Sequence, residues 1–470
     1  MTTPLIESLL DPHRYPHSAA HVELLETHIS WILLAGEFAY KIKKPVVLPF
    51  LDYGTTDKRR ACCAAELRLN RRYAPDIYVD VVEFDGEPAV KMRRFPEACR
   101  LDHVCRRGEL TPVHLSDLAR SLADFHAAAA TASADTRFGE PEQVLAPALE
   151  NFAELRKLLP AEGERLTELE QWTRGEFAAK SPVMARRKAE GRVRECHGDL
   201  HLGNLVLIDG KATPFDCIEF NEDFRWIDAA SEIAFTWLDL LDHGQPGLAT
   251  WFLNEWLVWS GDYDALSVLR FYAVYRALIR AKVAALQGGI GEAGEYLAMA
   301  KGLTAPPPPT LTITYGLSGS GKTTASTARL MGDLRAASIR LRSDVERKRL
   351  HGLAPDAASG GAIYGHQATL RTYARLLTLA EETVRRGWSA IVDAAFLKRG
   401  ERDEFRALAE RLGVPFALLA CEAPFEELRR RLLERSGDAS EATVAVLVQQ
   451  TAWAEALDDD ERAEAINPDT

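Results

Sequence analysis

Residues 311–324 read Leu311-Thr-Ile-Thr-Tyr315, followed by Gly316-Leu-Ser-Gly-Ser-Gly321-Lys322-Thr323-Thr324. The first five residues are apolar or β-branched, which predicts a short buried strand. The next segment fits the pattern GxxxxGK[ST], and residues 325–331 then suit a helix. Glycines let a backbone wrap around a phosphate chain, and amide groups at a helix start point toward it. The stretch therefore predicts a phosphate-binding loop inside an α/β domain with a parallel sheet.

The pattern gives the residues of this loop distinct roles. Lys322 is predicted to reach the β- and γ-phosphates of ATP and to act in catalysis, and Thr323 to offer its hydroxyl to Mg²⁺. The other residues expected to contact the nucleotide are Gly316, Ser318, Gly319, Ser320, Gly321 and Thr324.

Two acids stand at the ends of further strand candidates in the same domain. Asp344 follows residues 338–341, and Asp393 ends residues 389–393. A carboxylate at such a strand end can take the proton of an attacking hydroxyl or orient Mg²⁺, so both are catalytic candidates. Arg347 lies one helical turn after Asp344 and is a candidate for holding the acceptor. Each acid also fits a simple helix or loop cap.

Residues 416–420 predict a further strand, and residues 426–435 predict a helix that carries several arginines. Phosphotransferases with this loop often close a basic lid over the nucleotide. Arg431 and Arg435, four residues apart, are the lid candidates, although an arginine stripe also fits an exposed helix face. With its loop, acids and arginines, this domain resembles the shikimate-kinase-like, gluconate-kinase-like and zeta-toxin-like P-loop kinases. The Asp344 and Arg347 pair is also similar to that of 5′-hydroxyl polynucleotide kinases.

A second motif lies earlier, at His197-Gly-Asp199-Leu-His-Leu-Gly-Asn204-Leu205. Asp199 and Asn204 are five residues apart, and Asp216 follows at the end of a strand candidate over 212–215. The protein-kinase template has this spacing between an Asp that receives the acceptor proton and an Asn that binds metal, with a later Asp on Mg²⁺.

This motif resembles the aminoglycoside phosphotransferase and choline-kinase-like branch of the kinase fold. The resemblance implies that Asp199 is the base and that Asn204 and Asp216 hold Mg²⁺. It also implies that Asp228 braces the catalytic loop, and it makes His197 a scaffold residue.

The lysine that holds ATP is expected in a small lobe before the motif. Strand candidates 29–34 and 38–42 flank a turn at 35–37, and a helix is predicted over 58–72. Lys41 occupies the strand where the kinase fold carries this lysine, and Glu66 would be its partner in the helix. Lys43 points to the same strand face, so the choice between the two lysines stays open. No GxGxxG loop precedes them.

One more candidate group lies on the predicted helix 271–287. Tyr272, Arg276 and Arg280 fall at i, i+4 and i+8 and form one stripe. Two arginines there would suit an anionic acceptor. Ion pairing with Asp239, Asp242 or nearby acids is the simpler explanation of the stripe.

The chain divides at Thr304-Ala-Pro-Pro-Pro-Pro-Thr310, because four consecutive prolines cannot continue a helix. We therefore expect three segments. Residues 1–302 form an α+β bilobal phosphotransferase-like domain, with a small lobe over about 1–95 and a helical lobe over about 96–302. Residues 303–310 form a Pro-rich linker and residues 311–470 the P-loop domain. This order resembles bacterial proteins described as bifunctional aminoglycoside phosphotransferase/ATP-binding proteins.

Composition limits the partners. The net charge of −12 argues against extended nucleic acid, which needs a basic surface. Seven cysteines without a CxxC pair argue against a disulfide framework and favour a reducing, cytoplasmic compartment. No stretch reaches the roughly 18 apolar residues that a membrane span needs.

The sequence thus favours a bifunctional ATP- and Mg²⁺-dependent phosphotransferase acting on hydroxyls of small metabolites, such as sugar-like or nucleotide-like acceptors. One alternative is a single active P-loop kinase with a binding or regulatory N-terminal domain, supported by the missing glycine loop. Another is a kinase of nucleic-acid 5′-hydroxyl ends or of nucleotide sugars, which the Asp344 and Arg347 pair permits.

Overall fold

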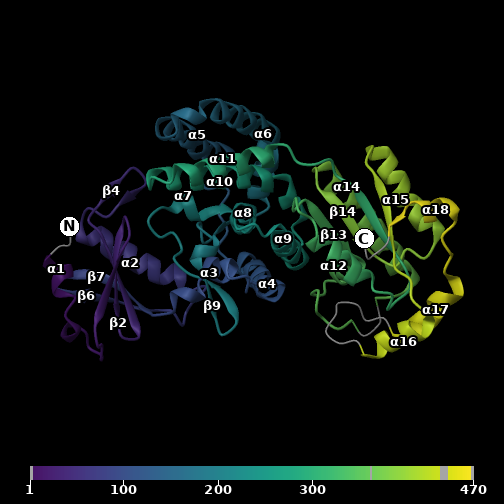
Figure 1. Ribbon diagram of the computed structural model, residues 1–470, viewed down its shortest axis with the longest axis horizontal. Helices are drawn as coiled ribbons and strands as arrows, with labels where there is room; N and C mark the ends of the chain where they lie inside the picture. The colour runs from purple at the N-terminus through teal and green to yellow at the C-terminus, as the bar shows by residue number, and fades with distance from the viewer. Residues whose placement is uncertain (1–3, 360–362, 435–442, 467–470) are drawn as a thin grey trace.

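The computed structural model of the 470-residue chain describes residues 4–359, 363–434 and 443–466. Three bodies follow one another along its longest axis: a small lobe at the N-terminal end, a helical lobe in the middle, and an α/β domain at the C-terminal end (Figure 1). None of the helices in the described ranges is both long and apolar enough to cross a bilayer. All seven cysteines are free thiols.

The small lobe is built on a five-stranded antiparallel sheet in the order β1-β2-β3-β7-β6. Its strands are β1 (Val22–Glu26), β2 (Ser30–Ala35), β3 (Phe38–Lys43), β6 (Tyr78–Phe84) and β7 (Glu87–Arg93). The predicted helix is α2 (Thr56–Asn70), which packs on β6 and β7. The smaller elements are α1 (Pro4–Ser8), η1 (Pro12–Arg14), β4 (Val47–Leu48) and β5 (Leu51–Asp52).

Strand β1 was not predicted from the sequence. It is an edge strand in the described sheet, and its residues are half-buried or exposed, so it lacks a strong apolar alternation. The predicted turn between β2 and β3 is present. Gly36 lies there at φ 57°, and a Cβ at this position would stand 2.6 Å from the Ser18 carbonyl oxygen.

In the helical lobe, two short pairs of antiparallel strands flank the second motif. β8 (Val193–Glu195) pairs with β11 (Trp226–Asp228), and β9 (Leu205–Ile208) pairs with β10 (Lys211–Pro214). Its larger helices are α4 (Pro112–Ala128), α5 (Pro141–Leu158), α6 (Gly163–Ala189), α8 (Ala229–Asp242), α9 (Pro246–Ser260), α10 (Leu269–Leu286) and α11 (Ile290–Thr304). Its short elements are η2 (Glu97–Cys99), α3 (Leu101–Arg106), η3 (Pro160–Glu162), η4 (Leu202–Asn204), α7 (Glu222–Arg225) and η5 (Tyr263–Ser267).

The C-terminal domain has the predicted parallel sheet, in the order β13-β14-β12-β15-β16. Its strands are β12 (Leu311–Tyr315), β13 (Ser338–Arg342), β14 (Ser389–Asp393), β15 (Phe416–Ala420) and β16 (Ala465–Ile466). Its helices are α12 (Lys322–Met331), α13 (Ser343–Leu350), α14 (His366–Arg385), α15 (Arg399–Leu412), α16 (Phe425–Glu434), α17 (Val444–Trp453) and α18 (Asp459–Ala463). The fold class expected from the sequence, a bilobal α+β domain followed by an α/β P-loop domain, is confirmed.

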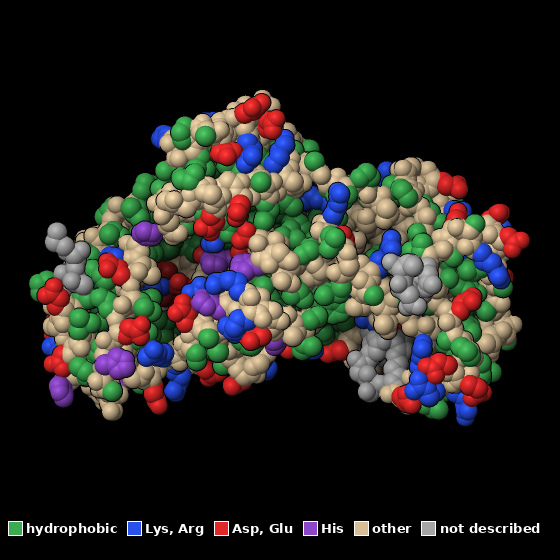
Figure 2. All heavy atoms as spheres, in the orientation of Figure 1, with side chains coloured by type: hydrophobic (Ala, Val, Ile, Leu, Met, Phe, Trp, Pro, Cys, Tyr) green, Lys and Arg blue, Asp and Glu red, His purple; other side chains and the backbone are tan. Residues whose placement is uncertain are grey.

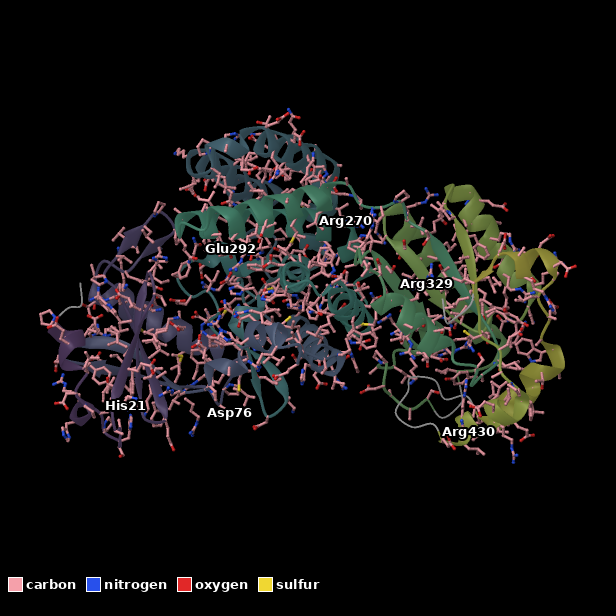
Figure 3. All side chains as sticks on the ribbon, in the orientation of Figure 1. His21, Asp76, Arg270, Glu292, Arg329 and Arg430 are labelled. Carbon is pink, nitrogen blue, oxygen red and sulfur yellow. The ribbon has the colours of Figure 1, made fainter. Side chains whose placement is uncertain are left out.

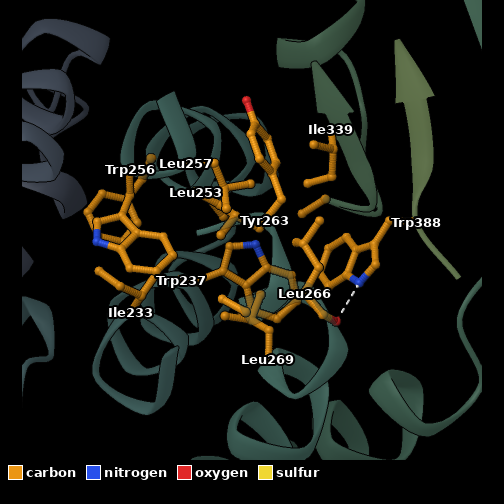
Figure 4. Packing of buried hydrophobic residues seen from close by; sticks show 14 of the residues in the cluster. Ile233, Trp237, Leu253, Trp256, Leu257, Tyr263, Leu266, Leu269, Ile339 and Trp388 are labelled. Carbon is orange, nitrogen blue, oxygen red and sulfur yellow. Dashed lines mark hydrogen bonds between the residues drawn. The ribbon is translucent and has the colours of Figure 1, made fainter. Parts of the chain in front are cut away.

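One hydrophobic core runs through the helical lobe and the α/β domain, although the proline segment separates them in sequence. Trp237 of α8 and Trp388, just before β14, lie with ring centroids 6.0 Å apart (Figure 4). The Trp388 indole N–H donates to the Leu266 carbonyl (3.1 Å). Arg270 of α10 lies at the same junction (Figure 3) and donates to the Gly387 carbonyl (2.8 Å). The two domains therefore share buried surface as well as a connecting segment.

Candidate active sites

The small lobe brings two lysines onto one glutamate. Lys41 Nζ lies 3.0 Å from Glu66 Oε1 and also contacts Asp216 Oδ1. Lys43 Nζ lies 2.6 Å from Glu66 Oε2 and contacts Glu219. The Lys43 side chain is fully buried, whereas Lys41 sits beside the Asp216 carboxylate, which is 42% exposed. This geometry favours Lys41 over Lys43 as the lysine that would reach a nucleotide.

Lys41 and Glu66 hold each other in their charged forms. Burial alone would lower the pKa of Lys41, but the carboxylates of Asp216 and Glu66 outweigh it and raise that pKa well above its usual value. Burial would likewise raise the pKa of Glu66, but Lys41 and Lys43 outweigh it and lower that pKa to about 2. The site therefore presents a fixed ammonium group next to an exposed carboxylate.

Asp216 has an unusual backbone. Its φ of 63° lies in the left-handed region, which costs a non-glycine residue about 1 kcal/mol or more. Its N–H donates to the Tyr78 hydroxyl (3.0 Å), and the next N–H donates to Asn70 Oδ1 (2.9 Å). Strand β6 and helix α2 thus hold the strained turn that directs the Asp216 carboxylate at Lys41. Strain kept in place by its neighbours is typical of functional positions.

The second motif forms a compact loop around Asp199. Asn204 Nδ2 donates to both the main-chain oxygen and Oδ2 of Asp199, each at 2.9 Å, and His201 Nε2 lies 3.5 Å from Oδ2. Burial would raise the pKa of Asp199, but the His201 imidazole outweighs it and holds that pKa well below its usual range. Asp199 is therefore a carboxylate at neutral pH and can accept a hydrogen bond from an acceptor hydroxyl.

Helix α8 holds this loop through residues for which no such role was predicted from the sequence. Glu232 Oε1 accepts hydrogen bonds from the N–H groups of His197 (2.5 Å) and Gly198 (3.0 Å). Asp239 Oδ2 accepts from Leu202 N (2.7 Å), and the Thr236 hydroxyl donates to a loop carbonyl. The sequence does carry a signal for them, because these three polar residues fall at i, i+4 and i+7 of an otherwise apolar helix.

Two scaffold expectations have different outcomes. His197 is fully buried; its Nε2–H donates to the Phe215 carbonyl (2.8 Å) and its Nδ1 accepts from Asp199 N (3.3 Å), which agrees with a scaffold role. Asp228 is also structural, but the loop brace expected of it is supplied by Glu232. Asp228 instead pairs with the buried Arg187 (2.7 and 2.8 Å) and caps the start of α8.

The three side chains of the predicted stripe on α10 have different environments. Tyr272 lies in the hydrophobic core, 3% exposed. Arg276 is buried and donates to the Gly198 carbonyl (3.0 Å), so it also supports the loop, at the carbonyl of the residue whose N–H Glu232 binds. Arg280 is half-buried and donates to the Tyr296 hydroxyl (3.2 Å), which in turn donates to Asp242 (2.7 Å). Charged and histidine side chains gather over this part of the molecule (Figure 2).

The glycine-rich loop has the backbone that its sequence predicts. Gly316, Gly319 and Gly321 all have positive φ, at 146°, 84° and 93°. A Cβ on Gly316 would stand 2.2 Å from the Cys421 carbonyl oxygen, so no other residue fits there. Lys322 begins α12 and folds back over the loop, where Nζ donates to the carbonyls of Gly316 and Leu317 at 2.8 Å each. Thr323 and Thr324 follow in the first turn of α12.

The acids of the α/β domain occupy neighbouring strand ends. Asp393, at the end of β14, is buried beside α12, where the Ser326 hydroxyl donates to it (3.1 Å). Asp344 lies in the first turn of α13, directly after β13. Arg347, one turn later, is 7% exposed and donates to the Thr369 hydroxyl (3.1 Å). The structure thus brings Asp344 and Asp393 to the same edge of the sheet as the loop, because β12, β13 and β14 are parallel.

Two side chains approach the loop from C-terminal helices. Arg431 of α16 lies 3.5 Å from the Gly319 carbonyl and pairs with Glu427 (2.7 Å), so it stands next to the loop, and its role in a lid stays a prediction. Gln450 of α17 was not foreseen; its Oε1 accepts the hydrogen bond of Ser318 N (2.8 Å). Ser320 is buried within the loop. Arg435, the second lid candidate, lies outside the described residues.

The donors present fit magnesium. In the N-terminal half, the Asp216 carboxylate is substantially exposed. The side-chain nitrogen of Asn204 donates to Asp199, so the side-chain oxygen of Asn204 is the atom that could bind a metal. In the C-terminal half, the Thr323 hydroxyl stands at the start of α12. Such oxygen donors, supplemented by phosphate oxygens, are what Mg²⁺ prefers.

Comparisons with known proteins agree with this division. Residues 99–271 match the phosphotransferase enzyme family, and residues 311–457 match a family described as AAA domain. An uncharacterized protein of Mycobacterium tuberculosis (strain H37Rv) is 29% identical over 475 residues, covering 96% of this chain and 95% of its own. A Mycobacterium bovis protein gives the same values.

Solved structures with lower similarity were also found. The GDP complex of aminoglycoside 2′-phosphotransferase-IIIa is 15% identical with a TM-score of 0.43, covering 64% of this chain and 99% of that one. A choline/ethanolamine kinase family protein from Mesorhizobium loti is 12% identical with a TM-score of 0.41, covering 68% and 93%. From the family matches, the chain joins a domain of the phosphotransferase enzyme family, over residues 99–271, to a P-loop domain of the AAA type, over residues 311–457.

Proposed function

We propose that this protein is a bifunctional phosphotransferase in which each half uses ATP and Mg²⁺ to phosphorylate a hydroxyl group of a small metabolite. Sugar-like and nucleotide-like acceptors are the classes that we favour. The main support for the proposal is that Lys41 contacts both Glu66 and Asp216, next to the loop that carries Asp199. The same chain also has a complete glycine-rich loop in its C-terminal half.

In the N-terminal half, Lys41 neutralises phosphate charge, and Glu66 keeps its ammonium in place. Asp199 accepts the hydrogen bond of the acceptor hydroxyl and takes its proton as the acceptor oxygen bonds to the γ-phosphorus of ATP and the bond from that phosphorus to the β-phosphate oxygen breaks, releasing ADP. Asn204 and Asp216 would hold Mg²⁺, which neutralises charge on the phosphate oxygens. Positioning and charge neutralisation supply most of the rate in phosphoryl transfer, so this rigid, charged loop suits the task.

In the C-terminal half, the backbone amides of the loop and the start of α12 bind the phosphates. The Lys322 ammonium exchanges its hydrogen bonds to the Gly316 and Leu317 carbonyls for an ion pair with the phosphates. Asp344 takes the proton of the acceptor hydroxyl, and Arg347 and Thr369 form one wall of the acceptor side. Arg431 closes over the loop. Asp393 positions α12 through Ser326 and would help to hold Mg²⁺ near the phosphates.

The decisive experiment measures ADP release by the full chain with a library of sugars, amino sugars, nucleosides and short RNA ends. Wild type is compared with Asp199→Asn, Lys322→Ala and the double variant. We expect two acceptor-dependent activities, each reduced about 100-fold or more in one single variant and retained in the other.

The other outcomes have clear meanings. If Asp199→Asn changes nothing while Lys322→Ala abolishes all turnover, the N-terminal half is a binding module. If only RNA ends or nucleotide sugars support Lys322-dependent turnover, the C-terminal acceptor class is corrected. If the double variant retains full turnover, the proposal fails.

A further inference from the structure

Helix α13 sets the position of the acceptor-side residues in the α/β domain. It follows β13 directly and carries Asp344 in its first turn and Arg347 in its second. It is a helix of eight residues, which is too short to be stable without tertiary contacts. What holds β13 and α13 therefore decides where the Asp344 carboxylate stands.

Strand β13 is held by a side chain of the other domain. β13 is the edge strand of the described sheet, and its outer edge faces α9. Asn254 of α9, 2% exposed, donates from Nδ2 to the Ser338 carbonyl (3.0 Å) and accepts at Oδ1 from Arg340 N (2.7 Å). One amide thus satisfies two backbone groups that an edge strand would leave unpaired.

The Arg340 side chain strengthens the same contact. It is 3% exposed, and its guanidinium lies 5.5 Å from the Trp251 ring centroid and 3.9 Å from Glu255, both on α9. It also donates to the Thr327 hydroxyl of α12 (2.6 Å). Strand β13 is therefore fixed between α9 and the helix that follows the glycine-rich loop.

Helix α13 itself is held through a buried carboxylate. Glu346 is 1% exposed and accepts a hydrogen bond from the Tyr263 hydroxyl of η5 (3.1 Å). Arg349 contacts the same carboxylate and also donates to the Val258 carbonyl at the end of α9. Gly261, at φ 67°, makes room for this arginine, since a Cβ there would stand 2.9 Å from its Nε.

We propose that Tyr263 and Asn254 are positioning residues of the P-loop kinase site, although both belong to the phosphotransferase half of the chain. Asn254 holds β13 and Tyr263 holds α13, on either side of Asp344 in the sequence, and together they fix Asp344 relative to the transferred phosphate. This inference rests on the proposed function of Asp344. It implies that the helical lobe completes the acceptor side of the second site.

The contacts predict a specific kinetic effect. Tyr263 and Asn254 contact β13 and α13, while the phosphate-binding residues lie on the loop between β12 and α12. Losing the Tyr263 hydroxyl should therefore misplace the proton acceptor without changing how ATP is bound. We expect a lower kcat and an unchanged KM for ATP.

The test uses the full chain with Asp199→Asn as the background, so that the measured ATP hydrolysis is that which depends on Lys322. Water takes the place of the acceptor hydroxyl in this reaction, and Asp344 takes its proton. Tyr263→Phe removes one hydroxyl and keeps the ring, so the fold is preserved. We expect kcat to fall about 3–10-fold, with the KM for ATP changing less than about twofold. In an Asp344→Asn background the same substitution should have almost no further effect, because both act on one proton transfer.

A matched control is Tyr15→Phe, which removes another buried hydroxyl, one that donates to the Leu9 carbonyl (2.8 Å) in the small lobe. It should leave Lys322-dependent turnover unchanged. The inference is overturned if Tyr263→Phe leaves kcat at the background value, or if its effect is equally large with and without Asp344. If instead Lys322→Ala leaves ATP hydrolysis intact, the proposed function of the domain fails, which is a separate result.

Discussion

The two candidate sites are built in opposite ways. The phosphate-binding part of the C-terminal site is contiguous: nine residues from Gly316 to Thr324 supply the loop, the lysine and the hydroxyl, and Lys322 folds onto its own loop. The N-terminal site is distributed: Lys41 meets Asp216 across 175 positions of sequence, and Glu66 comes from a third segment. A contiguous site is positioned by local backbone, whereas a distributed one depends on how lobes and helices pack.

The largest expected effect tests this dependence. Glu66→Ala leaves Lys41 and Lys43 buried without their shared carboxylate, so we expect the small lobe to lose about 3–5 kcal/mol of stability. Urea unfolding followed by circular dichroism measures it. Lys322→Ala in the contiguous site should change stability by less than about 1 kcal/mol. Equal losses for both variants would contradict the contrast between the two sites.

The second prediction separates the two lysines. Lys41→Met should reduce Asp199-dependent turnover about 100-fold or more, because it removes the charge that faces the nucleotide. Lys43→Met should act mainly on stability, since it leaves the buried Glu219 without its ammonium partner. The measurements are steady-state kinetics and thermal melting of both variants. A larger kinetic loss in Lys43→Met would reverse the assignment.

The third prediction concerns a carboxylate that ties the small lobe to the motif. Burial would raise the pKa of Glu195, but the guanidiniums of Arg68, Arg72 and Arg225 outweigh it and lower that pKa to about 2 from 4.5. A lowered folded-state pKa adds stability that is present above the unfolded pKa and is lost as pH falls toward 2.

Glu195→Gln should therefore cost about 2–3 kcal/mol at pH 7, and the difference from wild type should shrink between pH 4.5 and pH 2. Urea unfolding at a series of pH values measures this. Glu37→Gln, in the exposed turn between β2 and β3, is the control and should follow the wild-type curve. A difference that stays constant with pH would show that the charge of Glu195 is not its source.

The smallest expected effect concerns the contiguous site. Gln450 accepts the hydrogen bond of Ser318 N, which a phosphate oxygen would use. Gln450→Ala removes this competitor, so the KM for ATP in Lys322-dependent turnover should fall about 2–5-fold, the worth of one hydrogen bond. Gln450→Glu should raise it by charge repulsion. Gln449→Ala, on the exposed face of α17, is the control, and a raised KM in Gln450→Ala would make Gln450 a nucleotide ligand.

The features that could be predicted from the sequence are the local ones, as in the contiguous phosphate-binding loop. The strands at 389–393 and 416–420 were predicted with the bounds that the structure has, because short apolar runs next to turn residues are a strong local signal. The loop glycines and Lys322 could be identified because the chemistry needs fixed spacing. The exposed strand β1 gave no such signal and was missed.

Long-range partners could not be predicted in the same way. The choice between Lys41 and Lys43 needed the position of Asp216, and the role expected of Asp228 belongs to Glu232, one helical turn later. Arg276 is a substrate candidate from the sequence but donates to the loop around Asp199, because a stripe on a helix does not reveal what packs against it. Asn254 is polar in an apolar helix, and only the neighbouring strand explains it.

The shared core beneath the proline segment has a practical consequence. A cut within residues 305–310, where the sequence places the boundary, would sever one covalent connection and leave the Trp388 and Asn254 contacts in place. Each fragment alone would expose an apolar face, and residues 305–470 would also expose the unpaired edge of β13, which promotes aggregation. Residues 1–304 and 305–470 should therefore behave as complementing fragments, soluble when produced together and poorly soluble when produced apart.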